Sequence, residues 1–239
     1  MVARGDLAIE IGPAVLPGVQ KQIIHLSNKL DRPVITATQM LDSMVNNPRP
    51  TRAEITDVAN AVLDGSDCLM LSAETASGKF PVDCVRTMHE IIREVEKTNV
   101  VYYQLDLEHE FTDVPETIGA CASLAALKLN ASAIVCLTTS GRTAGLIAQF
   151  RPRCRILAVT QNVETLNRLE IIWGIHTVQI DDYENSDDAM AKVIGRLQQY
   201  QLIRPGDRIV LTLGVPVTGK GKTNALRAFE VKEENLESL

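Results

Sequence analysis

The feature that most constrains the fold of this chain is a regular alternation of short apolar runs with longer segments of helical spacing. Three such pairs follow one another in the first 97 residues, and their apolar runs are hydrophobic on both faces. Runs of this kind are typical of parallel strands in a sheet that helices cover. Each run also ends in small or polar residues, and a β/α barrel carries its functional groups at the carboxyl ends of its strands. We therefore expect an α/β fold with part of a barrel in residues 1–97.

The expected elements have ordinary start and stop signals. A capping box from Thr51 to Glu54 precedes a helix that ends at Gly65, and Pro81 lies in the first turn of the next helix. In this part we expect an opening strand that ends at the Gly-Asp pair of residues 5–6, strands at 32–40 and 66–75, and helices at 16–30, 51–65 and 81–97. A polar stretch over 98–114 is typical of a linker.

A second block follows the linker, over residues 115–239. Its pattern predicts helices at 114–130, 141–150, 163–169 and 186–201, and strands at 132–138, 155–160, 175–180, 207–213 and 223–231. No sequence period repeats along the chain, so a repeat architecture is excluded. We expect a separate α/β domain with a mostly parallel sheet.

Composition excludes several classes of protein. The net charge is −6, the basic residues are scattered, and aromatic residues make up 4%, so neither nucleic acid nor an anionic membrane is an expected partner. No apolar run approaches the roughly 18 residues that cross a bilayer. The five cysteines are odd in number and contain no C-x-x-C pair, which argues against a disulfide framework and a zinc site. We expect them to be buried thiols of a cytoplasmic protein.

Three expected strand ends carry polar groups that are candidates for chemistry. A carboxylate at Asp6, beside Gly5, suits a Mg²⁺ ion that also touches substrate oxygens, although an Asp that caps a turn is the simpler interpretation. The hydroxyls and the amide of residues 36–40 could orient an anion, or could be ordinary strand-end polarity. Ser72 and Glu74 end the third strand, and no His lies near Ser72 in sequence, so a serine nucleophile has little support.

A fourth candidate is the segment LTTSGRT, which follows an apolar strand and opens a helix. Hydroxyls, a glycine, a cation and the free N–H groups of a helix start together form a cradle for an anion such as phosphate. A hydroxyl-capped helix is the alternative. The residues of this cradle are Thr138, Thr139, Ser140, Gly141, Arg142 and Thr143.

The segment GVPVTGKGKT, residues 214–223, nearly matches the phosphate-binding P-loop pattern. Gly221 follows Lys220 where that pattern requires Ser or Thr, so the hydroxyl that would hold magnesium is missing. The segment after it is typical of a strand rather than a helix. We expect a loop whose lysines, Lys220 and Lys222, face the hydroxyl cradle.

These sequence motifs, taken together, resemble those of pyruvate kinase of the bacterial type. MVARGDL, PVITATQML and NPRPTRAEITDVANAVLDGSDCLMLSAETASGKFP carry the resemblance in the first block, and LTTSGRT, FRPRCRILAVT and PGDRIVLTLG carry it in the second. One departure is Ala8, where the family usually has Gly. The resemblance implies the last three strand–helix units, strands six to eight, of an eight-stranded barrel, followed by the whole carboxyl-terminal regulatory domain. It also implies that barrel strands one to five, the lid domain, the strand carrying the family's Lys-x-Glu and the K⁺ ligands are absent.

The family transfers a phosphoryl group from phosphoenolpyruvate to ADP in glycolysis, which yields pyruvate and ATP, and a similar role is implied here. By resemblance, Asp6 is one of two carboxylates that bind Mg²⁺, and the backbone N–H groups of Gly5 and Asp6 face the substrate carboxylate at a helix start. Thr38 resembles the threonine that contacts the substrate, and Ser72 with Glu74 resembles a group that helps deliver a proton to the enolate. Because the catalytic lysine and the second carboxylate are implied to be absent, we expect this chain alone to be inactive.

In the second block the resemblance implies an allosteric site for a sugar phosphate or nucleotide at residues 138–143, together with Lys220 and Lys222. Tyr200 lies near the position where members regulated by fructose 1,6-bisphosphate carry an Arg, which favours a monophosphate or a nucleotide. A homotetramer is implied for the full-length enzyme. The alternative function is a regulatory module that binds a phosphorylated metabolite without catalysis.

Overall fold

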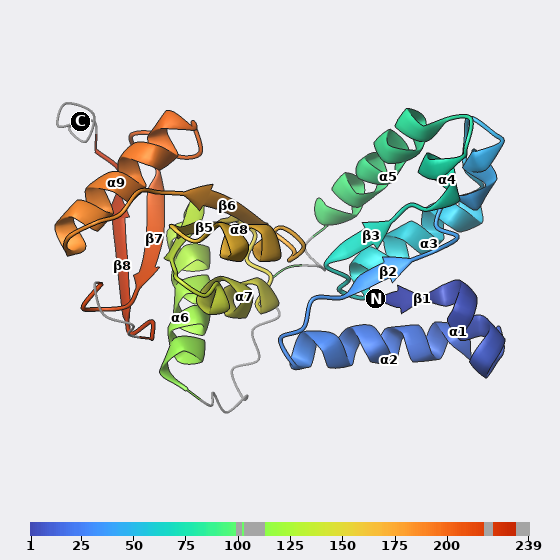
Figure 1. Ribbon diagram of the computed structural model, residues 1–239, viewed down its shortest axis with the longest axis horizontal. Helices are drawn as coiled ribbons and strands as arrows, with labels where there is room; N and C mark the ends of the chain where they lie inside the picture. The colour runs from blue at the N-terminus through green and yellow to red at the C-terminus, as the bar shows by residue number, and fades with distance from the viewer. Residues whose placement is uncertain (99–101, 103–112, 218–221, 233–239) are drawn as a thin grey trace. The chain divides into compact units, whose positions relative to one another are not determined.

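The structure is a computed structural model of the chain, and it describes residues 1–98, 102, 113–217 and 222–232. Figure 1 shows its helices and strands. The chain divides into two compact units, Met1–Val101 and Tyr102–Leu239, which we call unit 1 and unit 2. The linker expected over 98–114 lies mostly outside the described residues. Near its end Asp113 caps the first helix of unit 2.

Unit 1 is built on a parallel sheet of three strands in the order β1-β2-β3. Its elements are β1 (Val2–Ala3), α1 (Arg4–Ile11), α2 (Leu16–Lys29), β2 (Ile35–Ala37), the 3₁₀ helix η1 (Asp42–Val45), α3 (Arg52–Leu63), β3 (Cys68–Met70), α4 (Ala73–Ala76) and α5 (Pro81–Glu96). Because the strands are parallel, their carboxyl ends lie at one edge of the sheet. The described strands do not close into a barrel, as expected of three barrel units.

Two small cores hold unit 1 together. The larger joins residues of α3 and α5 with Met40, Leu41 and Met44 from the segment after β2, and the smaller lies between β1, α2 and the start of β2. The capping box expected at the start of α3 is confirmed: Thr51 Oγ1 accepts the backbone N–H of Glu54, and the Glu54 carboxylate accepts the N–H of Thr51. These packed helices fix the loops that follow β2 and β3.

Two expectations about strand ends are wrong. The opening strand holds only Val2–Ala3 and does not run to the Gly-Asp pair; the helix α1 begins at Arg4, so Gly5 and Asp6 lie in a first helical turn, as the family resemblance implied. Glu74 does not end a strand but lies in the short helix α4. In both places a polar side chain contacts the end of a neighbouring strand, and the sequence pattern does not reveal contacts that span more than 30 residues.

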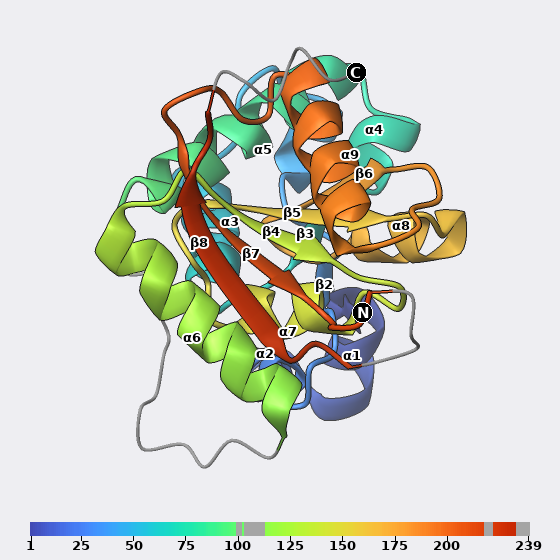
Figure 2. The same cartoon turned by 90° about the vertical axis from the view of Figure 1, so that its left-hand side faces the viewer.

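Unit 2 is an α/β domain with a sheet of five strands in the order β6-β5-β4-β7-β8 (Figure 2). The first four strands are parallel and β8 is antiparallel to β7, which confirms the mostly parallel sheet. Its elements are α6 (Val114–Leu129), β4 (Ala133–Leu137), α7 (Arg142–Gln149), β5 (Arg155–Thr160), α8 (Val163–Leu169), β6 (Ile175–Gln179), α9 (Ser186–Gln199), β7 (Arg208–Leu213) and β8 (Ala225–Glu230).

The two faces of this sheet pack against different helices. On one face α9 contributes Ala189, Val193 and Leu197 to a core with the strands. On the other face α6, α7 and α8 contribute small and aliphatic residues, with Ala122 and Ile147 fully buried. The strands are therefore covered on both sides, which explains their continuous hydrophobic pattern.

The cysteines follow the expectation only in part. All five are free, and Cys84 and Cys136 are buried, but Cys121 is exposed. Its neighbours in α6, Ala120 and Ala122, occupy the buried positions of that helix instead. Among the described residues, none of the helices combines the length and apolar character that crossing a bilayer requires.

Candidate functional site

The carboxyl edge of the unit 1 sheet brings together residues that lie far apart in the sequence. The backbone N–H of Gly5, in the first turn of α1, donates to Thr38 Oγ1 at 3.1 Å. Asp6 is the next residue of that turn, and its side chain is exposed. Gly5 and Thr38 are therefore in direct contact, with Asp6 next to Gly5 in the chain, although the N–H of Gly5, expected to face a ligand, donates here to the threonine.

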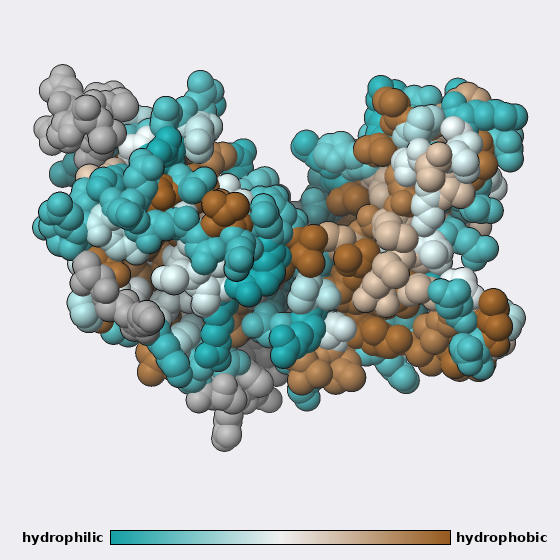
Figure 3. Space-filling view, in the orientation of Figure 1, coloured by the Kyte–Doolittle hydropathy of each residue, from teal (hydrophilic) through white to brown (hydrophobic). Residues whose placement is uncertain are grey.

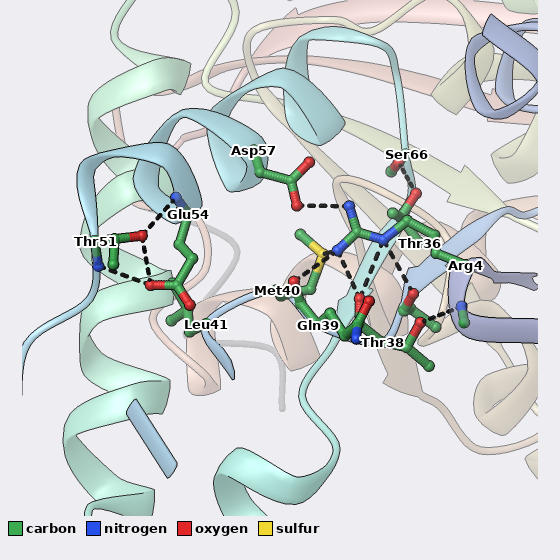
Figure 4. Close-up of polar contacts among 12 residues, drawn as sticks. Arg4, Thr36, Thr38, Gln39, Met40, Leu41, Thr51, Glu54, Asp57 and Ser66 are labelled. Carbon is green, nitrogen blue, oxygen red and sulfur yellow. Dashed lines mark hydrogen bonds and ion pairs between the residues drawn. The ribbon is translucent and has the colours of Figure 1, made fainter. Parts of the chain in front are cut away.

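The chain takes an unusual conformation directly after β2. Thr38 and Gln39 have φ angles of 70° and 53°, in the left-handed region that side chains with a Cβ rarely adopt. The guanidinium of Arg4 lies against this turn: Nη2 donates to the carbonyl oxygens of Thr38 at 2.6 Å and Gln39 at 3.0 Å. Figure 4 shows these contacts, together with the ion pair between Arg4 Nη1 and Asp57 Oδ2 at 2.5 Å.

Two carboxylates hold the next residues of the same segment. Glu74 is 1% exposed and accepts the N–H of Leu41 at 3.1 Å and the N–H of Ser72 at 2.7 Å. It thus ties the segment after β2 to the segment after β3. The Ser72 hydroxyl is buried and has no hydrogen-bond partner among the described residues.

Glu54 fixes η1 to the start of α3. Its carboxylate accepts the N–H and the hydroxyl of Ser43 at 2.7 Å and 2.6 Å, and the N–H of Thr51 at 2.7 Å (Figure 4 shows the capping box). Burial raises the pKa of the Glu54 carboxyl, but the hydrogen bonds from Ser43 and Thr51 outweigh it and hold that pKa below its ordinary value. A charged Glu54 is therefore part of the folded structure.

The described residues provide only part of a magnesium site. Mg²⁺ in phosphoryl-transfer sites is usually held by one or two carboxylates together with substrate oxygens. Asp6 fits as one such ligand, because it is exposed and follows Gly5, whose backbone N–H contacts Thr38. No group of three or more His, Cys, Asp or Glu side chains that could hold a metal ion occurs among the residues described. Asp6 alone does not complete the site.

Unit 2 contains a hollow of about 640 Å³ at the carboxyl ends of its parallel strands. Among the residues expected to bind phosphate, those that line it are Thr138, Thr139, Ser140, Arg142, Thr143 and Lys222. Gly141 lies within the same segment as the N-cap of α7, with φ 78°. Lys220 lies outside the described residues.

Several polar groups of this cradle already have partners within unit 2. The Thr138 hydroxyl accepts the N–H of Gly141 at 3.0 Å, and the hydroxyls of Thr143 and Thr223 lie 2.5 Å apart. Arg142 forms an ion pair of 2.6 Å with Asp113, so part of its positive charge is compensated. A hydrogen bond from the Glu116 N–H, together with the charge of Arg142, holds the pKa of Asp113 below its ordinary value.

Three polar residues that line the hollow were not predicted from the sequence. Gln161 follows β5, and Asp182 and Tyr183 follow β6. Their position after two parallel strands is the signal that could have found them, because such strand ends meet at one edge. Asp182 also brings a negative charge to the hollow.

Tyr200 lies at the end of α9, outside the lining of this hollow. It is the C-cap of α9, is 54% exposed and is not among the residues lining the hollow. The guanidinium of Arg196 lies 5.8 Å from the centre of its ring. The preference for a monophosphate over a bisphosphate, which rests on this Tyr in place of an Arg, stays a prediction. The strand β8 begins at Ala225, shortly after the GKGKT segment, so the helix that a P-loop needs is replaced by a strand.

Comparison with protein families covers most of the chain. The family model described as the barrel domain of pyruvate kinase matches residues 1–85, and the model described as its alpha/beta domain matches residues 116–229. The two matches fall in unit 1 and unit 2 respectively.

Curated relatives agree with the family models. The chain is 42% identical to the pyruvate kinase of Geobacillus stearothermophilus over 98% of its own length and 40% of that relative. It is 43% identical to pyruvate kinase 2 of a Synechocystis strain over 97% of its length and 39% of the relative. The chain therefore spans about 40% of the length of these relatives.

Proposed function

The chain belongs to the pyruvate kinase family, and from this premise we propose that unit 1 carries the substrate-binding part of a pyruvate kinase active site. The reaction transfers a phosphoryl group from phosphoenolpyruvate to ADP, takes up a proton and yields pyruvate and ATP. The observation that carries the proposal is the hydrogen bond from Gly5 to Thr38 Oγ1, which unites two candidate residues 33 positions apart. A cytoplasmic location is part of this proposal.

Each residue of the strand edge has a role in the proposal. Thr38 Oγ1 accepts from Gly5, so its own proton can be donated to a substrate oxygen. The helix start at Gly5 and Asp6 attracts the substrate carboxylate. Asp6 would hold Mg²⁺, which when bound neutralises charge on the transferred group. A second carboxylate and the ligands of K⁺ are not assigned to any described residue.

Ser72 and Glu74 have a supporting role. The Ser72 hydroxyl is buried without a hydrogen-bond partner in the described part of the chain, which leaves it able to relay a proton to the enolate. Glu74 would hold that hydroxyl in place through the N–H of Ser72. Both roles are part of the proposal and can be tested by substitution of these residues.

Two measurements on the 239-residue chain test this function. Titration with phosphoenolpyruvate and Mg²⁺, followed by amide NMR, should shift the signals of Gly5, Asp6 and Thr38. Thr38→Val should abolish these shifts, and Thr56→Val, an exposed threonine on α3, should retain them. If phosphoenolpyruvate shifts none of these amides, the site is wrongly assigned.

A coupled assay with phosphoenolpyruvate, ADP and Mg²⁺ should show turnover several powers of ten below about 10 s⁻¹, because the charges that stabilise the transferred phosphoryl group are incomplete. Turnover at the rate of a typical enzyme would contradict the view that this chain holds only part of the site.

The hollow in unit 2 supports a second function, namely regulation by a phosphorylated metabolite. We propose that residues 138–143 bind a sugar phosphate or a nucleotide, with Lys222 as a cation beside them; Lys220 belongs to the same proposal. We also propose, from the family resemblance, that the full-length enzyme is a homotetramer. The alternative function is a regulatory module that binds a phosphorylated metabolite and catalyses no reaction.

Calorimetric titration of the chain with fructose 1,6-bisphosphate, sugar monophosphates and AMP tests the regulatory site. A charge-assisted hydrogen bond contributes roughly 1.5–3 kcal/mol, so Ser140→Glu, which adds a negative charge to the cradle, should weaken binding tenfold or more. Ser132→Glu is the matched control, because this exposed serine lies at the opposite end of β4. Equal affinities for both variants would reduce the cradle to a helix cap.

A further inference from the structure

Arg4 is a charged side chain that is almost entirely buried, with 7% of its surface exposed. Besides its ion pair with Asp57, its guanidinium donates to backbone carbonyls at the end of β2 from two nitrogens. Nε contacts the Thr38 oxygen at 3.1 Å, and Nη2 contacts the oxygens of Thr38 and Gln39. Burying a cation is costly unless hydrogen bonds and an opposite charge compensate it, and here backbone carbonyls provide much of that compensation.

The backbone that it contacts is strained. Both Thr38 and Gln39 have positive φ angles, and Thr38 is β-branched, which makes the left-handed region especially unfavourable. In this conformation the carbonyl oxygens of both residues come within hydrogen-bonding distance of one guanidinium group. A relaxed backbone would turn at least one of these carbonyls away from Arg4.

We propose that Arg4 is a positioning residue that holds Thr38 and Gln39 in the left-handed conformation and thereby places the Thr38 hydroxyl against the N–H of Gly5. The inference rests on the proposed function only in that Thr38 meets the substrate there. Arg4 itself does not touch the substrate. It acts through the backbone of the residue that does.

The chemistry of the contact requires arginine. A guanidinium presents five N–H donors in a planar fork, so it can serve two carbonyls and the Asp57 carboxylate at the same time. The single ammonium of a lysine cannot reach all three with the same geometry. Asp57, whose side chain is 36% exposed, balances the charge from the direction of α3.

A purely structural role is the competing explanation. In that case Arg4 would only join α3 to the strands through Asp57, and the conformation of Thr38 would not depend on it. The two explanations differ in what a glycine at position 39 does, because glycine adopts positive φ angles without steric strain.

The experiment measures the backbone of the unliganded chain by NMR, through the Cα and Cβ shifts and the three-bond couplings of residues 38 and 39. Arg4→Gln should lose the left-handed values at both residues. Adding Gln39→Gly should return Thr38 toward its original values, since one of the two strained residues no longer needs to be held. Asp31→Gly is the matched control: Asp31 also has a positive φ, 53°, but lies before β2, at the opposite end from Thr38.

Ligand binding gives a second readout of the same variants. The affinity for phosphoenolpyruvate with Mg²⁺ should fall about tenfold or more in Arg4→Gln, a factor that corresponds to the strain of one left-handed residue. It should recover in Arg4→Gln/Gln39→Gly but not in Arg4→Gln/Asp31→Gly. A merely structural ion pair would not be rescued by a glycine at position 39.

The outcomes separate the two proposals. If phosphoenolpyruvate binds no variant, the proposed function fails, and the backbone shifts still decide the role of Arg4. Unchanged shifts at residues 38 and 39 in Arg4→Gln, or equal rescue by both glycines, would overturn the positioning role. If Arg4→Gln does not fold, Arg4→Lys should lose the left-handed values while Asp57→Asn retains them, and identical behaviour of this pair would also overturn it.

Discussion

At the scale of single residues, Gly141 controls how the phosphate cradle begins. Its φ angle is 78°, and a Cβ at this position would lie 2.9 Å from a methyl carbon of Leu169. Gly141→Ala should therefore lower the free energy of unfolding of unit 2 for two reasons. Left-handed strain costs about 1–2 kcal/mol, and overpacking against Leu169 costs about 1–3 kcal/mol. Gly206→Ala is the control, because Gly206 has φ 86° but open space around its Cα.

Urea unfolding followed by the fluorescence of Trp173, which lies in unit 2, measures both glycine variants. We expect Gly206→Ala to lower the free energy of unfolding by the strain alone and Gly141→Ala to lower it further. Equal losses would mean that Leu169 moves aside without cost.

The cysteines provide a second prediction at this scale. Burial raises the pKa of the Cys136 thiol to about 12 and that of Cys154 to about 11, whereas Cys121 is exposed. Since the thiolate is the reactive form, a disulfide reagent at pH 8 should label Cys121 first, the partly exposed Cys154 more slowly, and the buried Cys136 only after unfolding. The variant Cys121→Ser should lose the fast phase of labelling, and a fast phase that persists in it would contradict the prediction.

At the scale of elements, the start of α3 depends on its capping box. Thr51→Ala removes the hydroxyl that accepts the N–H of Glu54, and loss of such a cap costs about 1 kcal/mol of stability. Thr56→Ala in the same helix is the control, because its exposed hydroxyl bonds only to the carbonyl of Arg52 within the helix. That variant should stay within about 0.5 kcal/mol of the parent.

Amide hydrogen exchange in the first turn of α3 distinguishes the two threonine variants. Thr51→Ala should speed exchange there, and Thr56→Ala should not. The Glu54 carboxylate would keep its bonds to Ser43 in both, so η1 should remain protected. Equal exchange in both variants would show that packing, rather than the cap, starts the helix.

At the scale of the whole molecule, unit 1 should be the less stable unit. Its sheet has three strands, and β1 and β3 are its edges within the described residues, whereas the sheet of unit 2 has five. Apolar side chains also remain exposed on α2 and at its C-cap, namely Leu26 at 55% and Leu30 at 59%, and Figure 3 shows apolar surface over this helix. Less apolar burial leaves less free energy to hold the unit folded.

Limited proteolysis and urea unfolding test this order. Cleavage should occur before about residue 115 first, and far-UV circular dichroism should lose signal at lower urea than Trp173 fluorescence, which reports unit 2. A single coincident transition, with unit 1 as resistant to protease as unit 2, would show that unit 1 is independently stable.

The amino-acid sequence was enough to predict the longer helices, the strands of unit 2 and the family. Hydrophobic periodicity and capping residues predicted α3 with its capping box at Thr51 and Glu54. The sequence motifs predicted a partial barrel followed by an α/β domain. These signals are local, because hydrophobic spacing and capping depend on residues a few positions apart. The candidate residues at strand ends were also found in this way, since parallel strands carry such groups at one edge.

How those residues are held depends on the three-dimensional packing of the chain. The burial of Arg4, the place of Glu74 in a helix, the position of Asp182 at the hollow and the absence of Tyr200 from it were not predicted. Each depends on which strand lies next to which, so that residues more than 30 positions apart come into contact, as Arg4 and Thr38 do. No local pattern encodes such a contact, because its partners share no helix face, turn or strand.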